Sequence, residues 1–351
     1  MHRLFYLPLL PNLQPLNHAV MKAKVLLLFS VIPIPIVLGA QNESWFQKGR
    51  EATEPKEMIE YYTKSIEQEG VSVCTFYYRG MAKYDLKDYK GAADDFTIAI
   101  KTDSKYRDGV KIRAELKDNL KAQNDAYSND RMDSMNTENC RKLSYYSHGN
   151  ANYNLQDYMA AIDDYSKFIL IDPNNQEYYN SRSYAYNSRS ASYYFLKRYD
   201  LAIADISKYI SLKPDDPNGY NNRGLCYLTL AKYDDAIAEF NKTIRLKPDY
   251  ASAYADRGYA YMQQGKWETA IDDFNKCLKI DEETFSTNLD LAIIYYLKGN
   301  LQESKKYLGI AKSLEPRLSK GIDVIAEFEK EGYYWTDKDK ETLKKMFVEL
   351  K

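Results

Sequence analysis

Residues 251–283 read ASAYADRGYAYMQQGKWETAIDDFNKCLKIDEE, and residues 218–250 just before them read NGYNNRGLCYLTLAKYDDAIAEFNKTIRLKPDY. Each stretch contains a glycine, an alanine twelve residues later and an aromatic residue four residues after that. Four stretches of the chain share this spacing, and they are Gly80/Ala92/Phe96, Gly149/Ala161/Tyr165, Gly224/Ala236/Phe240 and Gly258/Ala270/Phe274. The prolines keep the same interval, since Pro214 and Pro248 are 34 residues apart and Pro316 follows after 68. A period of 34 residues indicates an internal repeat.

The repeated pattern resembles the tetratricopeptide repeat, a helix-turn-helix unit with small and aromatic residues at fixed positions. The spacing suits two antiparallel helices that pack closely. The glycine and the alanine are small where the backbones approach, and the aromatic side chain fills the remaining gap. Prolines in turns such as LKPDY end the second helix, because proline cannot continue a helical hydrogen-bond ladder. The resemblance implies an all-α fold, an α-solenoid of stacked repeats that forms a right-handed superhelix.

Seven copies of the repeat cover most of the chain after residue 41. They are 42–71, 73–106, 142–175, 183–216, 217–250, 251–284 and 285–318. The first copy is degenerate and has a shortened connection between its helices. The interval from Pro173 to Pro214 is 41 residues, and the extra seven correspond to about two helical turns. We therefore expect a long helix in the fourth copy, with its extra turns protruding from the stack.

Residues 107–141 lack the glycine, alanine and aromatic columns of the repeat. They are either an eroded repeat or a helical insertion, and we favour the insertion. The chain then divides into a signal peptide at 1–40, N-terminal repeats at 41–106, an irregular helical insertion at 107–141, a main repeat array at 142–318 and a C-terminal helical cap at 319–351.

The first forty residues contain no acidic side chain. From Met21 onward the sequence MKAKVLLLFSVIPIPIVLGAQ has basic, apolar and small-residue segments in the order of a secretory signal peptide. We expect cleavage after Ala40, and Met21 is an alternative start. The apolar part is about fourteen residues, shorter than the roughly twenty that a membrane span needs. The interpretation is therefore an exported protein, periplasmic, secreted or at the cell surface of a Gram-negative-type bacterium, without a transmembrane span in the mature chain. An uncleaved anchor is the alternative.

The charges of the mature chain are nearly balanced. Removal of residues 1–40 leaves 46 basic and 50 acidic residues, a net charge of −4. This balance lacks the basic footprint that nucleic-acid binding usually requires, so we expect no nucleic-acid partner. The four cysteines form no CxxC pair and have no histidine at metal-ligand spacing, so we expect no metal and no cofactor. Cys226 and Cys277 occupy small buried positions of the repeat, and the pairing of Cys74 with Cys140 stays open.

A charged residue stands immediately before the repeat glycine, with an acid sixteen residues downstream. The pairs are Arg79 with Asp95, His148 with Asp164, Arg189 with Asp205, Arg223 with Glu239 and Arg257 with Asp273. A row of functional charges is one interpretation. Its recurrence in five of the seven copies favours a structural ion pair between the two helices of each of these repeats. The sequence contains no nucleophile, paired-carboxylate or phosphate-loop motif beyond these pairs, so we expect a protein that is not an enzyme.

In the family that the pattern resembles, variable positions of each first helix line a concave groove that contacts ligand. The resemblance implies that these positions include Tyr77, Tyr78, Tyr84, Tyr146, Asn150, Tyr153, Asn187, Tyr194, Asn218, Asn221, Asn222, Asp256 and Tyr259. Tyrosine and asparagine dominate this set. Tyrosine offers a large rigid surface with a hydroxyl group, and an asparagine amide both donates to and accepts from a peptide backbone. The implied ligand is an extended polypeptide, although core packing would also explain some of the tyrosines.

Residues 319–351 are predicted to form a C-terminal cap. Thr336 and Asp339 form a capping-box pattern at the start of a final helix. Apolar residues recur at helical spacing and should pack back onto the last repeat, and they are Leu343, Met346, Phe347 and Leu350. Such a stripe could instead recruit a partner helix.

The sequence thus predicts a non-enzymatic scaffold that binds a protein or peptide of unknown identity, in an unknown oligomeric state. Two alternatives are an envelope assembly component, which docks through the insertion and the long helix, and a carbohydrate-binding module.

Overall fold

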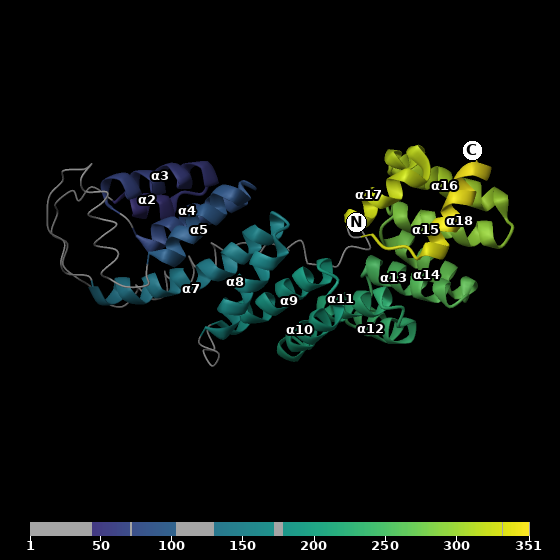
Figure 1. Cartoon of the computed structure of the whole chain (residues 1–351), viewed down its shortest axis with the longest axis horizontal. Coiled ribbons are helices and arrows are strands. Elements are labelled where there is room, and N and C mark those ends of the chain that lie inside the picture. Colours follow the sequence, from purple (N-terminus) through teal and green to yellow (C-terminus); the bar gives the residue numbers. More distant parts are fainter. Residues whose placement is uncertain (1–43, 71, 103–129, 172–177, 332, 351) are drawn as a thin grey trace. The chain divides into compact units, whose positions relative to one another are not determined.

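The computed structural model describes residues 44–70, 72–102, 130–171, 178–331 and 333–350 of the 351-residue chain (Figure 1). Every secondary-structure element in these ranges is a helix. The predicted leader and residues 107–129 of the predicted insertion lie outside the described residues, as do residues 103–106 of the second copy. The chain divides into two compact units between Ser192 and Tyr193. We refer to them as the N-terminal unit and the C-terminal unit.

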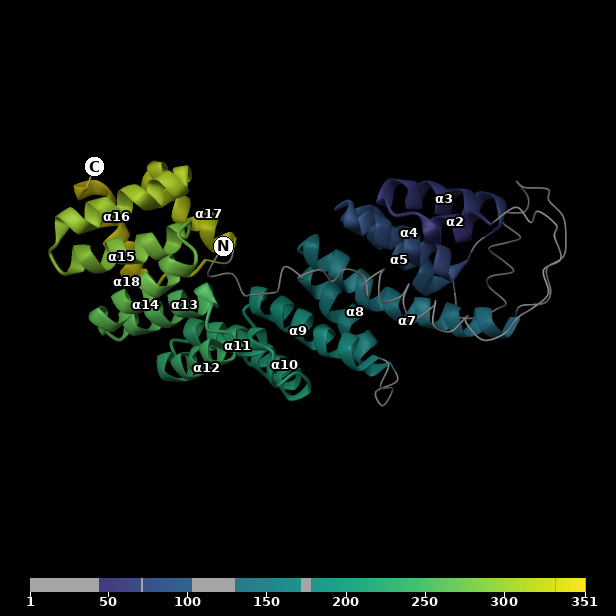
Figure 2. The same ribbon diagram turned by 180° about the vertical axis from the view of Figure 1, so that it is seen from behind.

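Within the two units the described helices up to η2 form six pairs, one for each predicted copy of the repeat except the fourth, which contains the boundary between the units. The N-terminal unit contains α2 (Trp45–Glu51), α3 (Pro55–Gln68), α4 (Val73–Asp85), α5 (Tyr89–Lys101), α7 (Asp130–Asn154) and α8 (Tyr158–Leu170), and the boundary between the units falls within α9 (Tyr179–Phe195). The C-terminal unit continues with α10 (Tyr199–Leu212), α11 (Pro217–Thr229), α12 (Tyr233–Leu246), α13 (Ala251–Gln263), α14 (Trp267–Ile280), α15 (Phe285–Leu297), α16 (Leu301–Leu314), the 3-10 helix η2 (Pro316–Val324), α17 (Ile325–Lys330) and α18 (Asp337–Glu349). Within each unit the paired helices lie side by side (Figures 1 and 2). The predicted all-helical solenoid is confirmed.

The glycine of each repeat lies directly against the aromatic ring of the same repeat. A Cβ atom built on Gly224 would lie 2.6 Å from Cε1 of Phe240, and one on Gly258 would lie 2.8 Å from the equivalent atom of Phe274. Both rings are fully buried. Because real Cβ contacts are longer than this, the two helices can approach so closely only with glycine at this position. The degenerate first copy keeps the same contact, between Gly49 and Tyr62.

The alanine of each repeat signature lies in the same tightly packed interface, on the second helix. The four alanines have no exposed surface, and they are Ala92, Ala161, Ala236 and Ala270. The aromatic residues four positions later are at most 1% exposed, and they are Phe96, Tyr165, Phe240 and Phe274. A Cβ atom on Gly80 or Gly149 would lie 2.8 Å from the ring of its own repeat, as in the later copies. The signature residues therefore form the core of the repeats and leave ligand contact to other positions.

The turns between the two helices of a repeat contain one residue in the left-handed conformation. Lys87 has φ 63°, Ala231 has φ 55°, and Gly265 occupies the same place with φ 74°. Glycine adopts this conformation without steric cost, whereas other residues are strained there. An aspartate caps the second helix in two of the repeats. Asp88 accepts from the Gly91 amide at 2.9 Å, and Asp157 accepts from the Ala160 amide at 3.0 Å.

The sequence predicted two irregularities, the insertion at 107–141 and a long helix in the fourth copy. Helix α7 begins at Asp130, inside the range 107–141, and is continuous with the first helix of the third copy. Helix α9 has 17 residues instead of the 13 of α11, so the fourth copy does contain a longer helix. The described start of this helix does not protrude, however. Tyr178 is buried there and its ring meets Phe168 of α8 edge-on, with centroids 6.2 Å apart, because a large aromatic side chain gains more from packing than from exposure.

The C-terminal cap forms as predicted in its last part. Thr336 and Asp339 make both hydrogen bonds of a capping box at the start of α18. Leu343 and Met346 are fully buried, and α18 packs against α15. The earlier part of the predicted helical cap, 319–351, is less regular, because Gly321 has φ 79° and interrupts the helical backbone there.

Candidate functional site

The recurrent charged pairs link the two helices of a repeat. The shortest nitrogen–oxygen distances are 2.7 Å for Arg79 and Asp95, 2.9 Å for His148 and Asp164, 2.8 Å for Arg223 and Glu239, and 2.7 Å for Arg257 and Asp273. Their acidic partners are mostly buried, and burial raises the pKa of Glu239 although Arg223 opposes that shift. The structural interpretation of these four pairs is confirmed.

The same basic residues also reach the preceding repeat. In four arginines, Nη1 of the guanidinium donates to a polar side chain on the second helix of the preceding repeat. The contacts are Arg79 to Thr63 at 3.2 Å, Arg189 to Ser166 at 2.8 Å, Arg223 to Ser207 at 3.1 Å and Arg257 to Asn241 at 2.5 Å. Nε2 of His148 lies 3.2 Å from the Thr97 hydroxyl in the same way. Each residue thus couples two neighbouring repeats within its unit. Sequence reasoning missed this second contact, although the column of polar residues sixteen positions upstream of most arginines was a usable signal.

In the N-terminal unit, two tyrosine pairs lie where the helices of a repeat meet at their turn, and Tyr194 with Tyr199 makes the same contact at 5.4 Å in the C-terminal unit. The rings of Tyr84 and Tyr89 are 5.1 Å apart and edge-on, and those of Tyr153 and Tyr158 are 5.5 Å apart in the same arrangement. All four side chains are half-buried. Asn154 donates to the Tyr84 hydroxyl at 2.8 Å and so joins the two repeats. We call these four tyrosines the tyrosine surface.

Burial determines the chemistry of this surface. It raises the pKa of the phenols of Tyr84 and Tyr153, so their hydroxyl groups stay protonated and can donate hydrogen bonds. The other predicted residues of the N-terminal unit divide into two groups. Tyr78 and Asn150 are half-buried, and Asn150 accepts from the Tyr165 hydroxyl at 2.8 Å. Tyr77, Tyr146 and Asn187 are buried, the first two in hydrophobic clusters of the core.

Most of the predicted residues of the C-terminal unit are buried. Asn221, Asn222, Asp256 and Tyr259 are each less than 2% exposed. Asn218 is half-buried and accepts from the Tyr250 hydroxyl at 2.8 Å. Tyr194 is buried, and its hydroxyl lies 3.1 Å from that of Thr229.

The tail of the chain reaches the first-helix face of the C-terminal unit. The Tyr259 hydroxyl donates to Asp339 at 2.5 Å, and the Gln263 amide donates to both oxygens of the same carboxylate at 2.8 and 3.1 Å. The Tyr334 ring meets that of Tyr259 edge-on at 6.3 Å. Sequence reasoning placed Tyr259 in the groove but missed Gln263 and the tail, because the two segments lie 76 to 80 residues apart.

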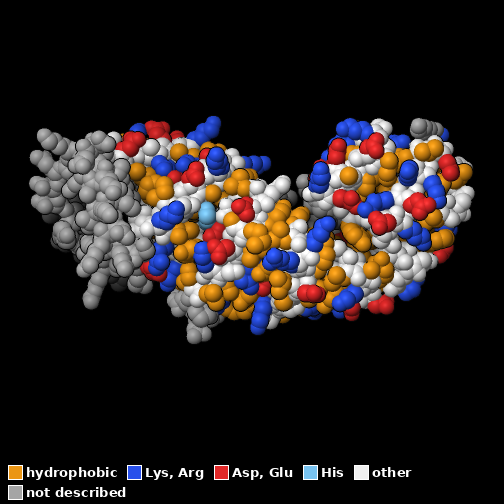
Figure 3. All heavy atoms as spheres, in the orientation of Figure 1, with side chains coloured by type: hydrophobic (Ala, Val, Ile, Leu, Met, Phe, Trp, Pro, Cys, Tyr) orange, Lys and Arg blue, Asp and Glu red, His pale blue; other side chains and the backbone are white. Residues whose placement is uncertain are grey.

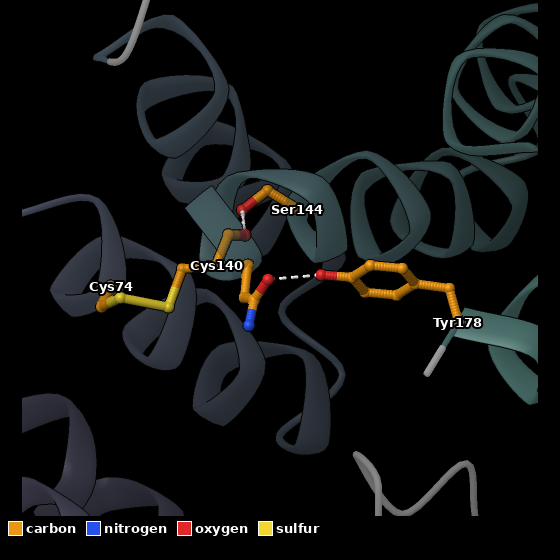
Figure 4. The surroundings of a disulfide bond; sticks show 5 residues. Cys74, Cys140, Ser144 and Tyr178 are labelled. Carbon is orange, nitrogen blue, oxygen red and sulfur yellow. Dashed lines mark hydrogen bonds between the residues drawn. A yellow bond between two sulfur atoms is a disulfide. The ribbon is translucent and has the colours of Figure 1, made fainter. Parts of the chain in front are cut away.

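A disulfide joins α4 to α7 in the N-terminal unit. Figure 4 shows Cys74 and Cys140 bonded, with Ser144 beside them on α7. The bond connects residues 66 positions apart, across a segment that lies outside the described residues. The other two cysteines, Cys226 and Cys277, are free and buried, as predicted. The pairing that the sequence left open is therefore a bond in the structure.

Stacked helix pairs, glycine–aromatic contacts and inter-repeat arginines define a helical repeat protein. Comparison with protein families agrees, because a tetratricopeptide repeat model matches residues 251–283, a TPR repeat model matches 231–265 and another tetratricopeptide repeat model matches 143–175 and 183–216. The chain is a tetratricopeptide repeat protein. Proteins of this family are generally scaffolds that bind other proteins. A search of the curated proteins found no match.

Solved structures share the fold. A tetratricopeptide repeat protein from Parabacteroides merdae is 14% identical with a TM-score of 0.55, over 87% of this chain and 97% of that one. The C-terminal part of a TPR repeat-containing protein from Cytophaga hutchinsonii is 20% identical with a TM-score of 0.50, over 77% and 93%. The Cut9–Hcn1 hetero-tetramer of the APC/C has a chain that is 13% identical with a TM-score of 0.54, over 94% and 52%. Among the described helices, none combines the length and apolar character of a membrane span.

Proposed function

We propose that the protein is a non-enzymatic scaffold that binds an extended polypeptide on the tyrosine surface of its N-terminal unit. The observation that carries this proposal is the repeated pair of half-buried, edge-on tyrosines, Tyr84 with Tyr89 and Tyr153 with Tyr158. Rigid rings with protonated hydroxyl groups provide apolar area and hydrogen-bond donors for a peptide backbone. Tetratricopeptide repeats support protein partners in general, and the paired half-buried tyrosines support this surface as the binding site.

The charge distribution supports a ligand recognised mainly through its backbone and apolar side chains. On the face seen in Figure 3, lysine and arginine side chains are interspersed with aspartate and glutamate. Such a mixture favours neither polyanions nor polycations, because fields of opposite sign cancel at a distance.

We also propose that the protein works in an oxidising compartment outside the cytosol. The predicted signal peptide supports export, and the bond between Cys74 and Cys140 supports an oxidising environment, in which disulfides persist. Expression of the tagged chain from Met1 and from Met21, followed by fractionation of the cells and non-reducing electrophoresis, tests this assignment. A reduced protein that stays in the cytosol would contradict it.

The binding surface is tested with a displayed library of random peptides panned against the full chain. Peptides that bind should lose affinity by about tenfold or more for a Tyr84→Ala/Tyr153→Ala variant, since aromatic anchors carry much of the binding energy in interfaces. The matched control is Tyr145→Ala, which removes a half-buried tyrosine from the same helix as Tyr153, where the ring faces Lys167 at 5.8 Å instead.

Each outcome of the panning experiment has a distinct meaning. Peptides that bind the wild type and the Tyr145 variant equally, and the double variant weakly, support the tyrosine surface. Peptides that bind all three equally place the binding site elsewhere and refute it. Competition by glycans, with no selected peptide, would favour the carbohydrate-binding alternative, since tyrosine faces can also stack on sugar rings. Circular dichroism confirms in each case that the variant is folded.

A further inference from the structure

The last segment of the chain, residues 333–350, has two separate attachments to the C-terminal unit. We call this segment the tail. Its first residues, 333–336, are not helical, and its remainder is α18 and one residue beyond. Tyr333 and Trp335 are buried in an aromatic cluster with Phe285 and Phe328, where the ring centroids lie 5.3 Å apart for Tyr333 and Phe285. In both views of the ribbon, α18 lies against α15 (Figures 1 and 2).

The apolar face of α18 suffices to cap the last repeat. Leu343 and Met346 are fully buried, and the Ser304 hydroxyl on α16 lies 3.6 Å from the Met346 sulfur. A terminal element of a solenoid needs only to cover the exposed face of the last helix pair, which here is α15 and α16. The bonds from Asp339 extend further, to α13 of the preceding repeat. Capping therefore does not explain them.

The start of α18 does not need these bonds either. The Asp339 carboxylate already accepts from the Thr336 amide at 3.0 Å and from its hydroxyl at 2.7 Å, and the Asp339 amide donates back to that hydroxyl at 3.2 Å. This capping box satisfies the first turn by itself. Tyr259 and Gln263 add a second set of donors to the same carboxylate, from another helix.

These two donors form a site suited to a carboxylate. Tyr259 and Asp339 are each no more than 5% exposed, so the bonds between them form away from water, where a charged acceptor strengthens them. Gln263 lies four residues after Tyr259, hence on the same face of α13, and its amide donates to both carboxylate oxygens. Both donors are neutral, so they offer hydrogen bonds to the carboxylate without an ion pair.

We propose that Tyr259 and Gln263 are a carboxylate-binding site on the first-helix face of the C-terminal unit, occupied here by the protein's own tail as an internal ligand. The partner that this site accepts is a polypeptide with the chemistry of the tail, aromatic residues followed by an acidic side chain in the first turn of a helix. Such a partner competes with Asp339 for α13. This inference is independent of the tyrosine surface, since it rests on residues of the other unit.

The test uses a labelled peptide of residues 333–350 as the probe, titrated into the full chain. An Asp339→Asn variant has a weakened internal ligand, so it should bind the peptide about tenfold more tightly than the wild type does. The matched control is Asp337→Asn, which changes an exposed aspartate of the same turn that pairs with Lys340 of α18 instead. A peptide in which Asp339 is replaced by asparagine should bind the variant chain about tenfold more weakly than the unchanged peptide.

Two further measurements keep the proposal open to refutation if Asp339→Asn disturbs folding. Tyr259→Phe removes only the hydroxyl group, and it should speed amide exchange in residues 333–350 while leaving α16 unchanged. Unchanged exchange in the tail would overturn the proposal, and so would equal peptide binding by the Asp339→Asn and Asp337→Asn chains. A concentration-dependent dimer that requires Asp339 would also overturn it, because the tail would then belong to a second copy.

Discussion

The glycine before each buried ring allows a quantitative test of the repeat packing. Replacing Gly224 with alanine places a Cβ atom 2.6 Å from Cε1 and 3.0 Å from two neighbouring atoms of Phe240, where ordinary contacts begin near 3.4 Å. The ring is fully buried, so it cannot move aside without displacing its neighbours. Overpacking of this kind costs about 1–3 kcal/mol of stability.

The chain contains its own control for the helix-propensity part of this change. Gly309 lies within α16, is exposed, and has no atom within 4 Å of a built Cβ. Both substitutions gain about 1 kcal/mol from the higher helix propensity of alanine, but only Gly224→Ala meets a ring. We expect Gly309→Ala to raise the free energy of unfolding, and the two variants to differ by about 1–3 kcal/mol.

The assay is urea unfolding followed by far-UV circular dichroism. Because repeat arrays can unfold in more than one step, amide exchange of α11 and α12 provides the local value. A shortened side chain in Phe240→Leu should relieve the clash, so the double variant should lose less stability than the sum of the two single variants. Equal stabilities of Gly224→Ala and Gly309→Ala would refute the close-packing argument for this repeat.

Three other predictions concern cysteines and a turn. Replacing Cys74 and Cys140 with serine should lower the stability of the N-terminal unit by up to about 4 kcal/mol in the chain-entropy account of a 66-residue loop, and calorimetry that finds no loss would contradict it. Ala231→Gly should raise stability by up to about 1 kcal/mol, because φ is 55° there, and a lowered urea midpoint would show that the turn is not strained. Burial raises the pKa of the Cys277 thiol to about 11, so this side chain remains a thiol at pH 8. Cys277 and the buried Cys226 should therefore react with a thiol reagent only after unfolding, and rapid reaction of the native chain would contradict this.

Local spacing predicted the repeats because each contact within a repeat joins residues at a constant separation. Gly258 and Phe274 are 16 residues apart, as are Arg257 and Asp273, so a clash or an ion pair in one copy recurs in the next. The capping box of Thr336 and Asp339 is closer still, three residues, and it too was predicted correctly. A periodic sequence therefore predicts these contacts directly, because neighbouring helical turns and adjacent helices bring residues at fixed sequence separations into contact.

The candidate site could be predicted only in part. The first-helix pattern selected Tyr84 and Tyr153, which are half-buried in the structure. The pattern could not distinguish them from Tyr146, which is buried in the core, because tyrosine is common both at solvent-exposed surfaces and in packed interiors. Whether any of these residues contacts a ligand stays a prediction.

By itself, therefore, the sequence determined the repeat, the helix pairs and the ion pairs within them, because these follow from short, constant separations. Only the tertiary structure decided two other features: the disulfide from Cys74 to Cys140 and the docking of Asp339 on Tyr259. Both join segments that the repeat period does not relate. The physical reason is that a contact between distant parts of the chain depends on how whole helices stack and where the tail turns back, and neither is encoded in any single window of residues.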